Sequence, residues 1–207
     1  MSSTTRLFLL RHGEVETRYH RVFGGSRVDM NLSDQGHEQA KHLADFLDGE
    51  TFDAIYASPM KRALQTMAAI TAKRSHQPEI IHPLQEVDFG DWTGLNWDEV
   101  RERFQVSPFQ WLHLLDQAAI PNGETGEQFR ARIEPVVKTI LEAQKGKTAA
   151  IICHGGVIRM ILSILLDLPL PKTSLFEIDY ASVTMLSIAS HKTEVKLMNF
   201  APWQHFA

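Results

Sequence analysis

The chain has 207 residues, a net charge of −4 and one cysteine, Cys153. This length favours one domain over residues 1–207, and a content of 43% hydrophobic and 22% charged residues is typical of a globular protein. The acidic balance gives no general attraction to nucleic acid or to an anionic membrane, and a single cysteine excludes an internal disulfide framework and a cysteine-built metal site.

The first predicted element is a strand made of four large apolar residues, 7–10, which follow a polar segment. The run is too short for a helix or a signal-peptide core, so we interpret it as a strand buried on both faces. It stops at Arg11, His12 and Gly13. Because open α/β sheets bind ligands at the carboxyl ends of their strands, these side chains are candidates for a binding site.

Residues 15–31 have little periodicity and carry Arg18, Arg21 and Arg27. We expect a long loop at the ligand edge, since ordered loops of this length are often functional. At least one of these arginines is expected to contact a second anionic or polar group of a substrate. The alternative is a solvated loop whose charges are balanced by nearby carboxylates. Ser33 then caps a helix whose apolar positions follow the helical period.

A second strand, 52–57, leads into a helix that we expect to begin at Ser58 and Pro59. Serine suits the capping position, and proline suits the first helical position. Arg62 falls in the first turn, where the helix dipole opposes a cation but free backbone N–H groups attract an anion. Position alone does not decide between a solvated surface arginine and one that holds an anion together with the helix end.

A short third strand is expected at 79–82, followed by a turn-rich segment dense in carboxylates. Glu86, Asp88 and Asp91 are each candidates for an acid, and physical reasoning does not rank them. Short helices are expected over 97–104 and 108–117.

A second strand-ending histidine follows much later in the chain. Thr125 and Gln128 form a capping-box pattern for a helix that Pro135 should kink or divide. The apolar strand 149–153 then stops at His154, which is followed by two glycines. Two such strand ends would bring two imidazoles to one rim of one sheet.

The remaining elements complete an α/β pattern. The apolar helix expected over 157–168 spans about half of what a bilayer needs, so we expect no membrane span and place the protein in the cytoplasm. Further strands are expected at 176–180, 183–189 and 195–200. Strands that alternate with helices indicate a three-layer sandwich with a mostly parallel central sheet and helices on both faces.

A phosphoryl group explains this collection of side chains best. Its oxygens need several fixed cations and N–H donors, which Arg11, Arg62, His154 and a helix end would supply. A neutral imidazole is a competent nucleophile toward phosphorus, so His12 or His154 would carry the phosphoryl group transiently. A carboxylic acid would protonate the departing alkoxide and then serve as base for water. No metal or other cofactor is needed, because the guanidinium groups stabilise the charge.

Five segments, in order, are similar to motifs of the histidine phosphatase superfamily, the phosphoglycerate mutase-like family. They are LRHGE at 10–14, NLSDQGHEQA at 31–40, ASPMKRALQT at 57–66, EVDFGDWTG at 86–94 and CHGG at 153–156. A single R-H-G would be a weak signal, whereas five motifs in the family's order are a strong one.

The resemblance implies His12 as the phosphorylated nucleophile and Glu86 as the proton donor. The residues that it places in the phosphate pocket are Arg11, Arg62, His154 and Gly155. It also implies a largely parallel sheet and a metal-independent phosphomonoesterase that needs no cofactor, takes a small phosphorylated metabolite and works through a phosphohistidine.

Several departures from the family pattern bear on the substrate. Val15 stands where many members have threonine or serine, Arg18 where many have asparagine, and Thr93 where glutamate is common. The segment 86–154 is also shorter than in cofactor-dependent mutases. We therefore favour hydrolysis over phosphoglycerate mutase activity.

Three other functions are weighed against hydrolysis. A phosphoglycerate mutase would move the phosphate between substrate hydroxyls instead of to water. A non-catalytic phospho-ligand-binding module is disfavoured because all the catalytic positions are occupied. A zinc hydrolase is disfavoured because no histidine pair has the helical spacing of a metal site. The substrate (a sugar phosphate, α-ribazole phosphate, nucleotide or phosphoprotein) and the oligomeric state are left open.

Overall fold

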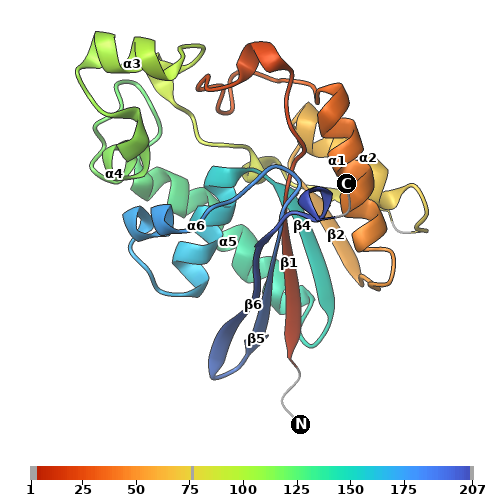
Figure 1. Cartoon of the computed structure of the whole chain (residues 1–207). Helices are drawn as coiled ribbons and strands as arrows, with labels where there is room; N and C mark the ends of the chain where they lie inside the picture. The colour runs from red at the N-terminus through yellow and green to blue at the C-terminus, as the bar shows by residue number, and fades with distance from the viewer. Residues whose placement is uncertain (1–3, 76, 206–207) are drawn as a thin grey trace.

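A six-stranded sheet forms the middle layer of the computed structural model, which describes residues 4–75 and 77–205 (Figure 1). The strands are β1 (Thr5–Arg11), β2 (Ala54–Ala57), β3 (Glu79–Ile80), β4 (Thr148–Cys153), β5 (Val183–Ala189) and β6 (Lys192–Phe200). Their order is β3-β2-β4-β1-β5-β6. Strands β3, β2, β4 and β1 pair in parallel, whereas β5 runs antiparallel to its neighbours β1 and β6. The predicted mostly parallel sheet is confirmed.

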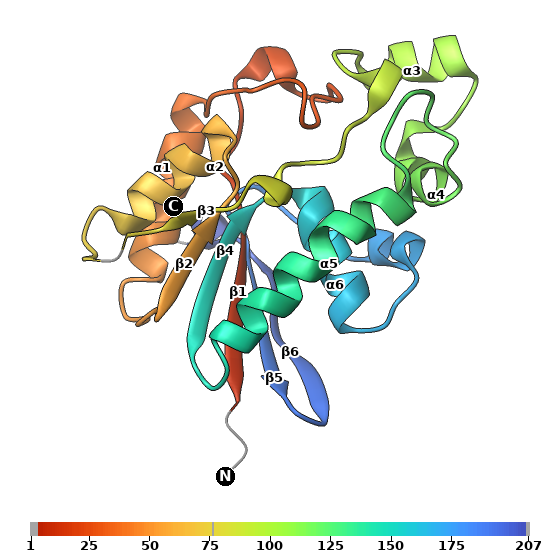
Figure 2. The same cartoon turned by 180° about the vertical axis from the view of Figure 1, so that it is seen from behind.

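Helices cover both faces of this sheet, as the sequence predicts. The α-helices are α1 (Asp34–Phe46), α2 (Lys61–Thr71), α3 (Trp97–Phe104), α4 (Trp111–Asp116), α5 (Gly126–Ala143) and α6 (Gly155–Leu165). Helices α1 and α2 lie on one face and α5 and α6 on the other, while α3 and α4 lie past the start of α5 (Figure 1, Figure 2). No helix in the described part of the chain is long and apolar enough to cross a membrane.

The apolar run of β1 supplies both layers of the core. Leu7 and Leu9 pack in the cluster that includes α5 and α6, whereas Phe8 and Leu10 pack in the cluster that includes α1 and α2. Successive side chains of a strand point to opposite faces, so an uninterrupted apolar run is what a central strand requires. Each such side chain contributes about 1.5–3 kcal/mol when fully buried. The position of β1 is therefore strongly fixed.

The register of β1 and β4 brings the two strand ends together. Arg11 is paired with Cys153, and the His12 backbone N–H donates to the Cys153 carbonyl at 3.1 Å. His12 and His154 therefore leave adjacent strands at the same edge of the sheet, as predicted from their positions.

The prediction of a strand at 176–180 is wrong. A short 3-10 helix, Leu170–Leu175, is followed by irregular backbone. The carbonyls of Phe176 and Ile178 accept hydrogen bonds from the guanidinium groups of Arg159 and Arg11. These carbonyls accept from two half-buried guanidinium groups instead of from a neighbouring strand.

Three further local expectations need correction. Helix α2 begins at Lys61 and not at Ser58, because the Ser58 hydroxyl is bonded to His154 Nε2 at 2.7 Å. The third strand is shorter than expected, since a 3-10 helix, His82–Leu84, replaces its end. Of the kink or division expected at Pro135, the division is wrong, since α5 runs through the proline with buried residues on both sides of it.

Candidate active site

His12 and His154 meet at the carboxyl ends of β1 and β4. Their ring centroids are 5.2 Å apart, and only 4% of His12 and 0% of His154 is exposed. The Arg62 Nε–H lies between the rings, 3.2 Å from His12 Nε2 and 3.2 Å from His154 Nδ1. Two histidines from segments 142 residues apart in the chain therefore share one guanidinium hydrogen.

The hydrogen-bond partners define the protonation of both rings. The Gly13 carbonyl lies 2.7 Å from His12 Nδ1 and can only accept, so Nδ1 carries the hydrogen and Nε2 keeps its lone pair. His154 Nδ1 accepts from Arg62, so its Nε2–H donates to the Ser58 hydroxyl at 2.7 Å. Both imidazoles are thus neutral, and the ring lone pair of His12 is on Nε2, where it accepts from Arg62.

The surroundings keep both imidazoles neutral. Burial, followed by the charges of Arg62 and Arg11, holds the pKa of His12 well below its ordinary value. Burial and Arg62, with a smaller effect of His12, do the same to the pKa of His154. A neutral imidazole at moderately acidic pH is the form that a nitrogen nucleophile needs.

Arg62 is buried at the centre of the site. It is 3% exposed, and besides the two histidines it donates to the carbonyls of Gly25, at 3.1 Å, and Val28, at 3.3 Å. Burial lowers the pKa of Arg62, although Glu86 opposes this effect. Of the two interpretations that position alone leaves open, a solvated arginine is wrong, since Arg62 lies inside the site.

Arg11 and Arg159 form a second pair of cations at the start of α6. A Cβ atom built on Gly155 would lie 3.3 Å from Arg159 Nη1 and 3.6 Å from Arg11 Nε, so both guanidinium groups approach this glycine. The Nε of each is buried with no partner in the described part of the chain. Burial and then Arg11 lower the pKa of Arg159 to about 10. Two buried N–H groups without acceptors indicate a site for an anion.

Glu86 is held against the first turn of α6. Its Oε2 accepts from the Gly156 N–H at 3.0 Å, and its Oε1 accepts from the Val87 N–H at 3.0 Å. Of the two other carboxylates predicted as candidate acids, Asp88 is paired with Arg27 at 2.7 Å, and Asp91 accepts from Asn122. Glu86 is the one of the three that lines the same cavity as His12.

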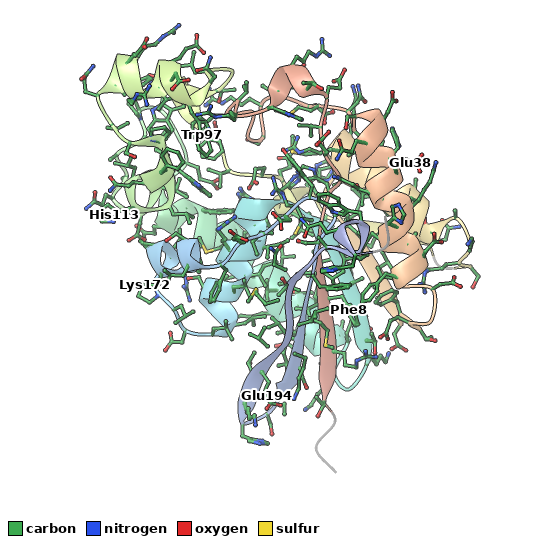
Figure 3. The ribbon with its side chains drawn as sticks, in the orientation of Figure 1. Phe8, Glu38, Trp97, His113, Lys172 and Glu194 are labelled. Atoms are coloured by element: carbon green, nitrogen blue, oxygen red, sulfur yellow. The ribbon has the colours of Figure 1, made fainter. Side chains whose placement is uncertain are left out.

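That cavity has a volume of about 400 Å³ and contains more than the cationic groups. It is also lined by the loop after β1, by Trp97 and Trp111, and by Tyr180. Trp97 stands at the start of α3 and is marked in Figure 3. Its backbone N–H donates to the Arg21 carbonyl at 3.1 Å, which joins α3 to this loop. The cavity is therefore lined by segments far from each other in sequence.

The three loop arginines lie in different places. Arg21 lines the cavity, with its guanidinium carbon 5.3 Å from the Trp97 ring centre. Arg18 is exposed and paired with Glu16 at 3.0 Å, and Arg27 is paired with Asp88. Only Arg21 of the three joins the predicted site residues. Within residues 4–75 and 77–205, no group of three or more His, Cys, Asp and Glu side chains is arranged to hold a metal.

Comparison with known proteins supports the motif-based resemblance. A family model of the histidine phosphatase superfamily (branch 1) matches residues 7–201. The chain belongs to the histidine phosphatase superfamily. The family relationship predicted from five short motifs is thereby confirmed, and it spans nearly the whole chain.

Several relatives of this histidine phosphatase match along nearly their whole length. The adenosylcobalamin/alpha-ribazole phosphatase of Escherichia coli is 26% identical over 94% of this chain and 95% of its own. Phosphoserine phosphatase 1 of Hydrogenobacter thermophilus is 26% identical over 94% of this chain and 92% of its own. The crystal structure of the alpha-ribazole phosphatase from Shigella flexneri has a TM-score of 0.82, with 26% identity over 94% of this chain and 96% of that one.

Some residues of this histidine phosphatase site are absent from the sequence-based prediction. Arg159 is one, although an arginine within the most apolar stretch of the chain is a usable signal, because a buried charge requires partners. The sequence predicts Ser58 as a helix cap and does not show that its hydroxyl bonds to His154 Nε2. Arg132 and Glu124, which contact the backbone around Glu86, give no local signal.

Proposed function

We propose that this protein hydrolyses phosphate monoesters of small metabolites through a phosphohistidine on His12, without a metal ion. The observation that carries the proposal is the unprotonated Nε2 of His12, which accepts a hydrogen bond from the Arg62 guanidinium beside His154. A single neutral nucleophile among buried cations suits attack on a dianionic phosphate.

In the first step, His12 Nε2 attacks phosphorus, the P–N bond forms and the P–O bond to the alcohol breaks. Arg11, Arg62 and His154 surround the phosphoryl group, and Gly155 lets it approach the N-terminus of α6. Glu86 gives its proton to the departing alkoxide. For this role, Glu86 must hold a proton in the substrate complex.

In the second step, water attacks phosphorus and the P–N bond breaks. Glu86, now a carboxylate, takes the proton of that water and is ready to act as acid again. Inorganic phosphate leaves and His12 Nε2 regains its lone pair. The guanidinium groups supply the charge stabilisation that other phosphatases obtain from metals.

The relatives support hydrolysis of small phosphate esters by this chain. Those named above are phosphatases of alpha-ribazole or of phosphoserine. The partner that we propose is accordingly a small phosphorylated molecule. The cytoplasm is the compartment that we propose on the basis of the sequence.

Phosphate release from a panel of phosphate monoesters tests this function. The wild-type protein should release phosphate equally with and without a chelator. His12→Ala should lose activity on the order of a thousandfold or more, since the nucleophile is gone. His37→Ala, on the exposed side of α1, is the matched histidine control. Near-normal turnover by His12→Ala, or loss of activity with the chelator, would contradict the proposal.

A further inference from the structure

The cavity at His12 has two chemically different parts. The deep part is cationic and holds Arg11, His12 and Arg62. Tyr180 packs against Arg11 and His12 in this part. The rest is bordered by Arg21 and by the aromatic side chains Tyr19, Phe23, Phe89, Trp97 and Trp111. A volume of about 400 Å³ is far more than one phosphate group fills. The remaining space is therefore where the alcohol part of a substrate lies.

The charged side chains of this lining are arginines and Glu86, and the small neutral polar side chains that commonly select sugar hydroxyls are missing from its described residues. Its residues in the described part of the chain include no serine, threonine, asparagine, glutamine, aspartate or lysine. Arg159 has both Nη groups bonded to the carbonyls of Gly155 and Phe176. A site that selects hydroxyls offers a matched donor or acceptor to each of them. Outside the phosphate pocket, this cavity offers aromatic rings beside the guanidinium group of Arg21.

The aromatic wall is held rigidly by contacts between its own rings. Phe23 lies 4.9 Å from Phe89 and 6.4 Å from Trp97, and Phe89 lies 5.4 Å from Trp111, measured between ring centres. Phe23 and Phe89 are 6% and 7% exposed, whereas the two tryptophans are half-buried. A wall fixed in advance binds a flat ligand without a further ordering cost.

We propose that the alcohol part of the substrate carries an aromatic ring that rests against this wall, while its phosphate lies at His12. Nucleoside monophosphates belong to this class. The inference rests on the proposed phosphatase function and names the substrate class of the same site. Contact between an aromatic base and an aromatic side chain improves binding by factors of about 5 to 150.

The test compares substrates whose leaving groups are all primary alkoxides and which differ in whether the alcohol carries an aromatic ring. We expect kcat/KM for adenosine 5′-monophosphate to exceed that for ribose 5-phosphate about tenfold or more, mainly through KM. The same order should hold for 2-phenylethyl phosphate over propyl phosphate. Trp97→Leu and Trp111→Leu should each reduce this preference, by lowering kcat/KM for the ring-bearing substrates more than for the ring-free ones. Phe46→Leu, at a surface aromatic of α1, is the control.

The outcomes separate this inference from the proposed function. Equal kcat/KM within both pairs, or turnover of phosphoserine but of neither ring-bearing ester, overturns the aromatic substrate class alone. No phosphate release from any monoester overturns the phosphatase function as well. An equal loss on all substrates in both tryptophan variants, with Phe46→Leu unaffected, means that the wall only supports the fold.

A separate set of contacts concerns the backbone that carries Glu86. Arg132 of α5 donates to the carbonyls of Pro83, Gln85 (2.8 Å) and Glu86 (3.1 Å). Its Nε and Nη2 also bond to the two carboxylate oxygens of Glu124, at 2.6 and 2.9 Å. One guanidinium therefore joins three carbonyls and a carboxylate.

Glu124 extends this attachment to the other side of Glu86. Its backbone N–H donates to the Asp88 carbonyl at 2.8 Å, and its Oε2 accepts from the Asp88 N–H at 3.4 Å. The side chains of Arg132 and Glu124 are 25% and 11% exposed. The chain is thus fixed to Arg132 of α5 at and before Glu86, and to Glu124, which precedes α5, just after it.

We infer that Arg132 is a positioning residue for Glu86. This inference also rests on the proposed role of Glu86 as acid. Arg132 fixes the backbone from which the Glu86 carboxylate reaches the Gly156 N–H. Lysine donates from one point and does not replace a fork that serves several acceptors. A small displacement of a catalytic group is enough to reduce its rate contribution strongly.

Leaving-group dependence distinguishes positioning from general support of the fold. Arg132→Met should lower kcat about tenfold or more for alkyl phosphates, which need the acid, and change it little for 4-nitrophenyl phosphate. Arg132→Lys should not restore the alkyl rate. Arg130→Met is the matched control, since Arg130 lies on the same helix and pairs only with Glu134, at 2.9 Å, among the residues described.

Glu86→Gln, measured in parallel, keeps this inference apart from the proposed function. If Glu86→Gln shows the selective loss on alkyl esters and Arg132→Met loses both substrates equally, the positioning role is wrong. If Glu86→Gln itself shows no selectivity, the acid role of Glu86 is wrong and the inference falls with it.

Discussion

At the scale of single residues, Arg62 is the group on which the site depends most. Its guanidinium donates to His12, His154, Gly25 and Val28, which come from three regions of the chain. A planar fork with five N–H donors serves these acceptors together, and an ammonium group does not. The residue thus joins His12 to the loop that contains Gly25 and Val28.

We expect Arg62→Lys to lower kcat/KM by about 10- to 100-fold, the effect of losing one or two charge-assisted hydrogen bonds. The measurement is steady-state hydrolysis of a phosphate monoester. Arg74→Lys is the control, because Arg74 also donates to backbone carbonyls, those of Leu47 and Glu50, but outside the active-site cavity. If Arg62→Lys keeps the kcat/KM of the wild-type protein, Arg62 does not bind the phosphate through its guanidinium fork.

The sequence predicts the individual site residues to different degrees. His12 and His154 are identified by a physical rule, since each ends an apolar strand. Glu86 is separated from Asp88 and Asp91 only by the family resemblance, because the choice depends on pairing with Arg27 and Asn122 across the fold. Long-range contacts of this kind leave no local pattern.

At the scale of elements, the loop between β1 and α1 divides its arginines between two environments. Arg21 lies in the cavity, and Arg18 lies outside it with Glu16. We therefore expect Arg21→Ala to raise KM for a substrate that fills the cavity about two- to tenfold, more at low salt than at high salt. Arg18→Ala is the control and should leave KM unchanged. If both variants keep the KM of the wild-type protein, the arginines of this loop do not contribute to substrate binding.

The start of α6 offers a second test at this scale. A Cβ atom on Gly156 would lie 2.4 Å from Glu86 Oε1, so alanine there pushes the carboxylate away. We expect Gly156→Ala to lower kcat on alkyl phosphates about tenfold or more. At Gly49 an added Cβ meets nothing within 4 Å, so Gly49→Ala is the control. Unchanged kcat in Gly156→Ala would mean that Glu86 does not act from its observed position.

The sequence predicts elements well where burial or a local capping hydrogen bond decides them. The apolar runs of β1 and β4 and the capping boxes or caps at Ser33 and Thr125 appear as expected. The segment 176–180 was predicted wrongly because Arg11 and Arg159 take its carbonyls. Apolar periodicity describes packing, but it does not show which distant side chain a carbonyl will meet.

At the scale of the whole molecule, the neutral histidines affect stability. Burial with Arg62 holds the pKa of both His12 and His154 well below the usual value. In the unfolded chain they take up protons as the pH falls below about 6.5, whereas in the folded protein they stay neutral until lower pH. The unfolded state then binds more protons, so the free energy of unfolding decreases as the pH is lowered.

We expect this loss to reach about 1 kcal/mol per histidine between pH 7.5 and 5.5. Urea unfolding in phosphate-free buffer at the two pH values measures it. His154→Asn should lose less stability on acidification than the wild-type protein, because one titrating group is gone. The same loss in both proteins would contradict the neutral state of His154.

The most direct test of the central claim is detection of the phosphoenzyme itself. The protein is mixed with a phosphate monoester, quenched within the first turnover at alkaline pH, and digested for mass spectrometry. We predict an acid-labile phosphoryl group on Nε2 of His12 in the wild-type protein and none in His12→Ala. Turnover without any phosphoenzyme, or phosphate bound to His154 or another residue instead, would contradict it.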